Sequence, residues 1–143
     1  MISPGDHVIS ICPTYQQHYS IPESFGAKLD ILWLRPENDF LPDLEELGRM
    51  LRPNTKLVVL NNPNNPTGAL LMGANLEEFV AVVRTSGAYI LCDEVYRGTN
   101  QVGNGFAPGM ADIYEKGISV SSMSKVFSLA GIRLGWIAAP REV

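Results

Sequence analysis

Six apolar runs of five to seven residues are spaced along the chain. Most of them lack the alternation of apolar and polar residues that marks a strand with one face in water. They therefore predict strands that are buried on both faces, as in a parallel sheet. The runs lie at residues 7–11, 29–34, 56–61, 89–95, 118–123 and 135–139.

Between these runs, apolar residues repeat with helical spacing. The segment 74–87 places four apolar residues on one helical face, and Asn75 is expected to cap its start. A second helix is predicted within 41–51, and a weaker one within 14–27, where Pro22 interrupts the pattern. Strands that alternate with helices predict an α/β protein, a three-layer α/β/α sandwich around a mostly parallel sheet.

The composition is typical of one globular domain. The chain has 143 residues, of which 45% are hydrophobic, and its net charge is −4. An acidic chain is a poor partner for nucleic acid or an anionic membrane surface, so neither is expected. Cys12 and Cys92 lie in apolar surroundings and are expected to be reduced core residues, which favours a cytoplasmic location. His7 stands outside any motif and is expected at the surface.

Polar motifs follow three of the predicted strands. NNPNNPTG at 61–68, DEVYRG at 93–98 and Lys125 each lie at or just beyond the end of an apolar run. Ligands bind α/β sheets at the carboxyl ends of their strands. Taken singly, each motif also fits an ordinary turn, and the Gly- and Asn-rich stretch 97–109 predicts a loop. Together, an amide, a carboxylate with a phenol, and a lysine indicate one ligand site.

The segment SVSSMSKVFSLAGIRLGW at 119–136 carries two isolated cations, Lys125 and Arg133, among small and apolar residues. Burying an unpaired ammonium group is costly, and a desolvated lysine amine becomes nucleophilic. One interpretation is that both cations lie on solvated loops. The other is that Lys125 bonds covalently to a ligand in a buried site, while Arg133 holds the ligand's anionic end.

These motifs, in this order and at this spacing, resemble the class I/II aminotransferase family of fold-type I pyridoxal-phosphate-dependent enzymes. The resemblance covers essentially the whole chain. It implies the cofactor pyridoxal 5'-phosphate and the exchange of an amino group between an amino acid and a 2-oxo acid. It also implies a homodimer or higher oligomer, and often a cis peptide bond before the proline of NPTG. Asn65–Pro66 is therefore expected to be cis, with Cys12–Pro13 as a second candidate.

The resemblance assigns roles to single residues. Lys125 would bond to the cofactor aldehyde and act as the catalytic acid–base. Asp93 would face the pyridine nitrogen, and His18 would support this aspartate from behind. No metal site is expected. The remaining cofactor-binding residues would be Tyr15 stacked on the ring, Asn65 and Tyr96 at its phenolate oxygen, and Ser122, Ser124 and Arg133 at the phosphate.

Three parts that the family carries are not found in this sequence. They are the glycine-rich phosphate loop upstream, the segment that carries a tyrosine into the partner subunit's site, and the C-terminal small domain whose arginine binds the substrate carboxylate. Residues 1–143 are therefore expected to be a single domain, the central part of the PLP-binding large domain, and the substrate stays open. Two alternatives also stay open. They are a PLP-dependent lyase or cyclase, such as a carbon–sulfur β-lyase, and a non-catalytic aminotransferase-like sensing domain.

Overall fold

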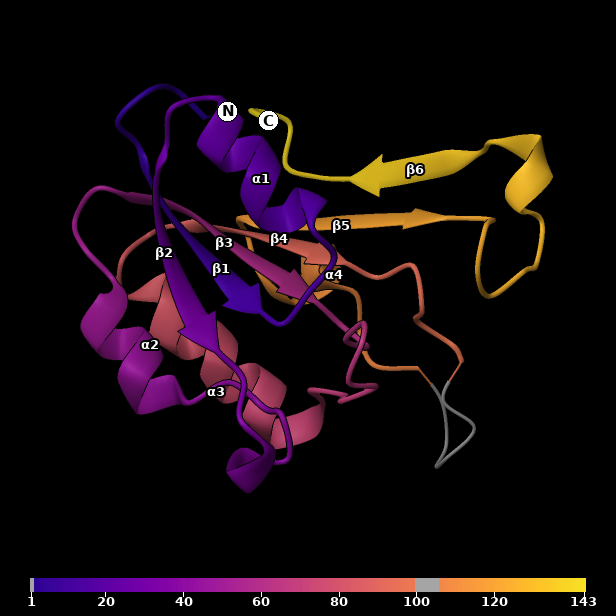
Figure 1. The fold of residues 1–143 in the computed structure, drawn as a ribbon, viewed down its shortest axis with the longest axis horizontal. Helices are drawn as coiled ribbons and strands as arrows, with labels where there is room; N and C mark the ends of the chain where they lie inside the picture. Colours follow the sequence, from indigo (N-terminus) through magenta and orange to yellow (C-terminus); the bar gives the residue numbers. More distant parts are fainter. Residues whose placement is uncertain (1, 100–105) are drawn as a thin grey trace.

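The computed structural model describes residues 2–99 and 106–143. Six strands form one sheet in the order β2-β1-β3-β4-β5-β6 (Figure 1). Strands β1 to β5 are parallel to their neighbours, whereas β6 runs antiparallel to β5. All six predicted strands are confirmed. They are β1 His7–Cys12, β2 Lys28–Trp33, β3 Thr55–Asn61, β4 Tyr89–Asp93, β5 Gly117–Ser122 and β6 Gly135–Ala138.

Helices lie on both faces of the sheet. Along β3, Val58 and Leu60 pack into the large core with α3, while Leu57 and Val59 face the side on which α1 lies (Figure 1). The predicted sandwich is thus confirmed, although α1 supplies most of its outer layer on one side. The helices are α1 Gln17–Ser24, α2 Leu44–Met50, α3 Gly73–Arg84 and α4 Met110–Ile113, with short 3-10 turns at Pro36–Asn38 and Ala130–Ile132.

The main core forms between the sheet and α2, α3 and α4. The predicted apolar face of α3 is buried in it, because Leu76, Phe79, Val80 and Val83 are all at most 3% exposed. Helix α1 contains Pro22, as expected. The predicted start of α3, with Asn75 as its cap, was wrong, however. The helix begins at Gly73, so Asn75 lies inside it and caps nothing.

His7 is buried, which contradicts the expectation that it lies at the surface. Its Nδ1 is 2.8 Å from Thr55 Oγ1, and its Nε2 is 3.0 Å from Asp30 Oδ2. The Arg52 guanidinium pairs with Asp30, and the Arg52 backbone N–H donates to Thr55 Oγ1 at 2.7 Å. These four residues, here called the amino-edge network, form a closed hydrogen-bond network near the amino ends of β1, β2 and β3. The buried imidazole is tolerated because both of its nitrogens have partners in this network.

Three X–Pro peptide bonds are cis. Those at Asn65–Pro66 and Cys12–Pro13 confirm the expectation, whereas the one at Asn62–Pro63 was not anticipated. Cys12 and Cys92 are buried free thiols, as predicted, and burial raises the pKa of both. Of the predicted loop 97–109, residues 100–105 lie outside the described residues, and 106–109 have neither helix nor strand. Within 2–99 and 106–143, no helix is long and apolar enough to cross a membrane.

Candidate active site

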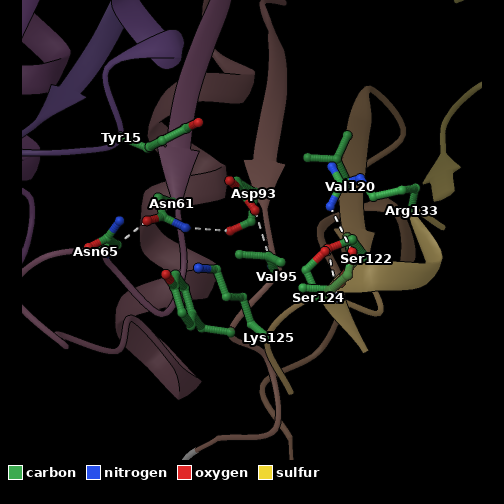
Figure 2. A pocket seen from close by; sticks show the side chains of 13 residues that line it. Tyr15, Asn61, Asn65, Asp93, Val95, Val120, Ser122, Ser124, Lys125 and Arg133 are labelled. Carbon is green, nitrogen blue, oxygen red and sulfur yellow. Dashed lines mark hydrogen bonds between the residues drawn. The ribbon is translucent and has the colours of Figure 1, made fainter. Parts of the chain in front are cut away.

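A cavity of about 470 Å³ opens at the carboxyl edge of the sheet, where β3, β4 and β5 end (Figure 2). The loop from β1 to α1 and the segment after β5 close its sides. Every residue predicted to bind the cofactor lines this one cavity, although the residues come from four separate parts of the chain. They are Tyr15, Asn65, Asp93, Tyr96, Ser122, Ser124, Lys125 and Arg133.

Asp93, the last residue of β4, is held from two directions. Its Oδ1 accepts a hydrogen bond from the Val95 backbone N–H at 3.0 Å. Its Oδ2 lies 3.1 Å from Nε2 of His18, and Nδ1 of His18 lies 2.9 Å from Thr14 Oγ1. His18 therefore makes the contact with Asp93 that the sequence predicted. The carboxylate is oriented before any ligand arrives, which is the arrangement that a specific hydrogen bond to a ligand requires.

Lys125 lies three residues beyond the end of β5, on the same edge of the sheet as Asp93 and Asn65. Figure 2 shows its side chain extending towards Asn61 and Asp93. Its Nζ is 5.8 Å from the centroid of the Tyr96 ring, within the range of a cation–π contact. Among the residues that the structure describes, the Lys125 side chain makes no hydrogen bond or ion pair. Its amine is free for a ligand.

The opposite end of the cavity is suited to an anion. Ser122 and Ser124 lie together, because the Ser124 backbone N–H donates to Ser122 Oγ at 3.3 Å. Arg133 donates from Nη1 to the Ala130 carbonyl at 2.8 Å, which leaves other donors of its planar fork for a ligand. Two hydroxyls and a guanidinium at one end of a cavity can bind a phosphate group.

The surroundings of Lys125 and Arg133 differ from the expectation of a buried segment. Both cations are exposed, and so are Phe127, Leu129 and Trp136. All four residues of β6 are exposed as well. The physical reason is that β6 pairs with β5 on one side only, and nothing in the described part of the chain covers its other side.

Two buried polar residues of the site region were missed by sequence reasoning. Asn61, at 2% exposure, lines the cavity and bonds to both Asn65 and Asp93. Glu94, at 5%, accepts from the Met110 backbone N–H at 2.7 Å and from Ser119 Oγ at 2.6 Å, and so joins α4 to β5. The available signal was their position inside the two motifs, NNPNNPTG and DEVYRG.

The chemistry of these donors fits pyridoxal phosphate. One end of the cavity offers hydroxyls and a guanidinium for a phosphate, and the other end offers a fixed carboxylate for a protonated ring nitrogen. The same cavity holds the amine of Lys125, unpaired among the described residues, which can attack an aldehyde. Asn65 and Tyr96 also line the wall, and their side-chain polar atoms make no hydrogen bond among the described residues.

The family model for aminotransferase class I and II matches residues 1–143. The chain belongs to this family. Membership implies pyridoxal phosphate as the cofactor, in agreement with the donors of the cavity. The match extends over both the strands that build the sheet and the three motifs at their carboxyl ends.

Individual relatives agree with this membership. The chain is 51% identical to a solved PLP-dependent aminotransferase from Streptococcus suis 89-1591, with a TM-score of 0.93 over 99% of this chain and 37% of that one. It is 32% identical over its whole length to the aspartate/prephenate aminotransferase of Thermus thermophilus, of which it covers 37%. It is also 33% identical to the capreomycidine synthase of Streptomyces vinaceus, over 96% of this chain and 35% of that one. The chain thus spans little more than a third of the length of these relatives.

Proposed function

We propose that the protein carrying this chain is a PLP-dependent aminotransferase, which exchanges an amino group between an amino acid and a 2-oxo acid. The observation that carries the proposal is the cavity itself. An unpaired lysine amine, a carboxylate fixed by His18 and Val95, and an anion-binding end with Arg133 meet in one space. Family membership supports the same activity.

Each residue then has a chemical task. When bound, pyridoxal phosphate supplies an aldehyde that captures amines and a ring that withdraws electrons. Lys125 would hold the cofactor through Nζ, and its amine would take the proton from the substrate α-carbon and later return it. Asp93 would keep the ring nitrogen protonated. Arg133 and the two serines would hold the phosphate end in place.

The remaining cofactor contacts act on the ring. Asn65 and Tyr96 would donate hydrogen bonds to the phenolate oxygen, and Tyr15 would supply an aromatic face for the ring. The Tyr15 ring already meets the His18 ring edge-on, with 5.8 Å between their centroids. This contact ties the stacking residue to the residue that supports Asp93.

We place residues 1–143 as the central part of the PLP-binding large domain, with the phosphate loop and the small domain supplied by the rest of the protein. The share of its relatives that the chain covers supports this placement. We also propose a homodimer in a reducing, cytoplasmic compartment. Exposed apolar side chains on the segment after Lys125 are typical of an interface, and two unpaired buried thiols suit a reducing compartment.

The decisive experiment is an amine-exchange assay of the full-length protein with a panel of amino acids and 2-oxo acids. A transaminase produces a new amino acid only when a second oxo acid is present. A β-lyase instead releases ammonia and an oxo acid without that acceptor, and a sensing domain binds the cofactor with no turnover. Either of the latter results would replace the proposal.

Covalent mapping tests the assignment of Lys125. Borohydride reduction of the loaded protein should leave the reduced cofactor on the peptide that contains Lys125, and the Lys125→Ala variant should carry none. An adduct on Lys28, Lys56 or Lys116 would show that another lysine bonds the cofactor.

A further inference from the structure

Asn61 occupies a junction between two residues of the site. It is the last residue of β3, and in the parallel register its Cα partner is Asp93, the last residue of β4. Its Nδ2 donates to the Asp93 carbonyl at 2.9 Å, and its Oδ1 accepts from the Asn65 backbone N–H at 2.7 Å (Figure 2). One planar amide therefore bridges the two backbones.

Both residues that Asn61 joins have proposed tasks at two different positions of the cofactor ring. Asp93 serves the ring nitrogen, and Asn65 serves the phenolate oxygen. The amide group of Asn61 is planar and rigid. Because the residue is only 2% exposed, water cannot readily replace the protein groups that it hydrogen-bonds. A rigid bridge with both ends occupied restricts the separation of the two residues.

We infer that Asn61 is a positioning residue, which sets the spacing between Asn65 and Asp93 and so matches both to the cofactor ring. The inference rests on the proposed function, since the tasks of these two residues come from it. Asn61 acts through two backbone groups and requires no contact with the cofactor.

Asn62 provides a matched control. It is the same residue type, it is next in the chain, and it is also buried, at 5% exposure. Its side chain likewise makes two hydrogen bonds, but both go to the backbone of Leu71, at 2.8 and 2.9 Å. Asn62→Ala removes the same chemical groups as Asn61→Ala without breaking a side-chain link to Asn65 or Asp93.

The experiment compares Asn61→Ala and Asn62→Ala in the full-length protein. Cofactor affinity is measured by titrating the apoprotein, and the absorption of the lysine-bound cofactor is followed against pH. We expect Asn61→Ala to weaken cofactor affinity about 10-fold, the equivalent of one displaced hydrogen bond. The pH at the midpoint of this absorption change should rise by roughly half a unit, because a displaced Asn65 no longer stabilises the free phenolate of the cofactor. Asn62→Ala should change neither quantity.

A third measurement needs no cofactor. Amide hydrogen exchange in the apoprotein reports directly on the Asn65 N–H, which Asn61 Oδ1 holds. This amide should exchange at least about 10-fold faster in Asn61→Ala than in Asn62→Ala. The inference is overturned if the two variants have the same Asn65 amide exchange rate, the same cofactor affinity and the same pH midpoint. Asn61 would then be an ordinary buried amide.

Asn61→Asp keeps the test valid if the alanine variant fails to fold. Aspartate can still accept from the Asn65 N–H but cannot donate to the Asp93 carbonyl. We expect protection of the Asn65 amide to persist while cofactor affinity falls, and unchanged affinity would contradict the inference. If the wild-type protein itself shows no lysine-bound cofactor, the proposed function fails instead, and the exchange comparison still decides whether the bridge exists.

Discussion

Two polar clusters lie at opposite edges of the same sheet. At the amino edge, His7, Asp30, Arg52 and Thr55 form a closed network in which each side chain is bonded to another member. At the carboxyl edge, the side chains of Lys125, Asn65 and Tyr96 line a cavity and have no hydrogen-bond partner among the described residues. The first cluster satisfies itself, whereas the second leaves its polar atoms free.

This difference separates structural from functional polar residues. A buried polar group destabilises the fold unless it is bonded, so a network that serves the fold closes on itself. A ligand site must keep donors and acceptors unpaired until the ligand arrives. Asp93 combines both features, since His18 and Val95 orient its carboxylate while it still faces the cavity.

The largest expected effect is on activity at the carboxyl edge. Lys125→Ala should lower kcat of the full-length protein by a factor of about 1,000 or more, because both the covalent attachment and the acid–base group are lost. Its free energy of unfolding should stay within about 0.5 kcal/mol of the wild type, since the side chain is exposed and makes no hydrogen bond or ion pair among the described residues. Steady-state kinetics and urea unfolding of the apoprotein measure the two quantities. A large loss of stability would show that Lys125 also holds the fold.

The reverse pattern is expected at the amino edge. His7→Ala should destabilise the protein by roughly 2–3 kcal/mol, because it opens a cavity and removes one hydrogen bond each from Thr55 and Asp30, which keep only their contacts with Arg52. At temperatures where the variant stays folded, kcat should be nearly unchanged. Urea unfolding with kinetics on the same preparation tests this. A lowered kcat with normal stability would remove the distinction between the two clusters.

A smaller effect should come from the support of Asp93. Thr14→Val keeps the size of the side chain but removes the hydroxyl that orients His18. We expect cofactor affinity to fall about 3- to 10-fold, as for one neutral hydrogen bond lost at a distance from the ligand. Titration of the apoprotein with cofactor measures it. Serine at position 14 should restore most of the affinity, and failure of this rescue would point to packing rather than orientation.

The smallest effect concerns a thiol beside the site. Burial raises the pKa of Cys92 well above its usual value, so its thiol should stay protonated and unreactive at pH 8 in the folded protein. A chromogenic thiol reagent should modify it only after denaturation. In the unfolded chain the Cys92 thiol has its ordinary pKa and loses its proton at lower pH than in the folded protein. The free energy of unfolding should therefore decline as the pH rises above about 9, near the pKa of a free thiol. Rapid native labelling of Cys92 would contradict its burial.

The strands and the helix faces could be predicted from the sequence, because burial imprints a local pattern on consecutive residues. The runs 7–11 and 56–61 became β1 and β3, and the apolar face of α3 proved buried. The candidate cofactor-binding residues also came from the sequence, through motifs that resemble a known family, and the strand ends bring them into one cavity.

The tertiary structure decided what depends on neighbours that are distant in the chain. His7 is buried because Thr55, 48 residues away, and Asp30, 23 residues away, supply its partners. Asn61 is a bridge only because the register of β3 and β4 places it beside Asp93. The apolar segment after Lys125 is exposed because, among the described residues, β6 has a neighbouring strand on one side only. Register and coverage arise when separate elements meet, so no local pattern of residues records them.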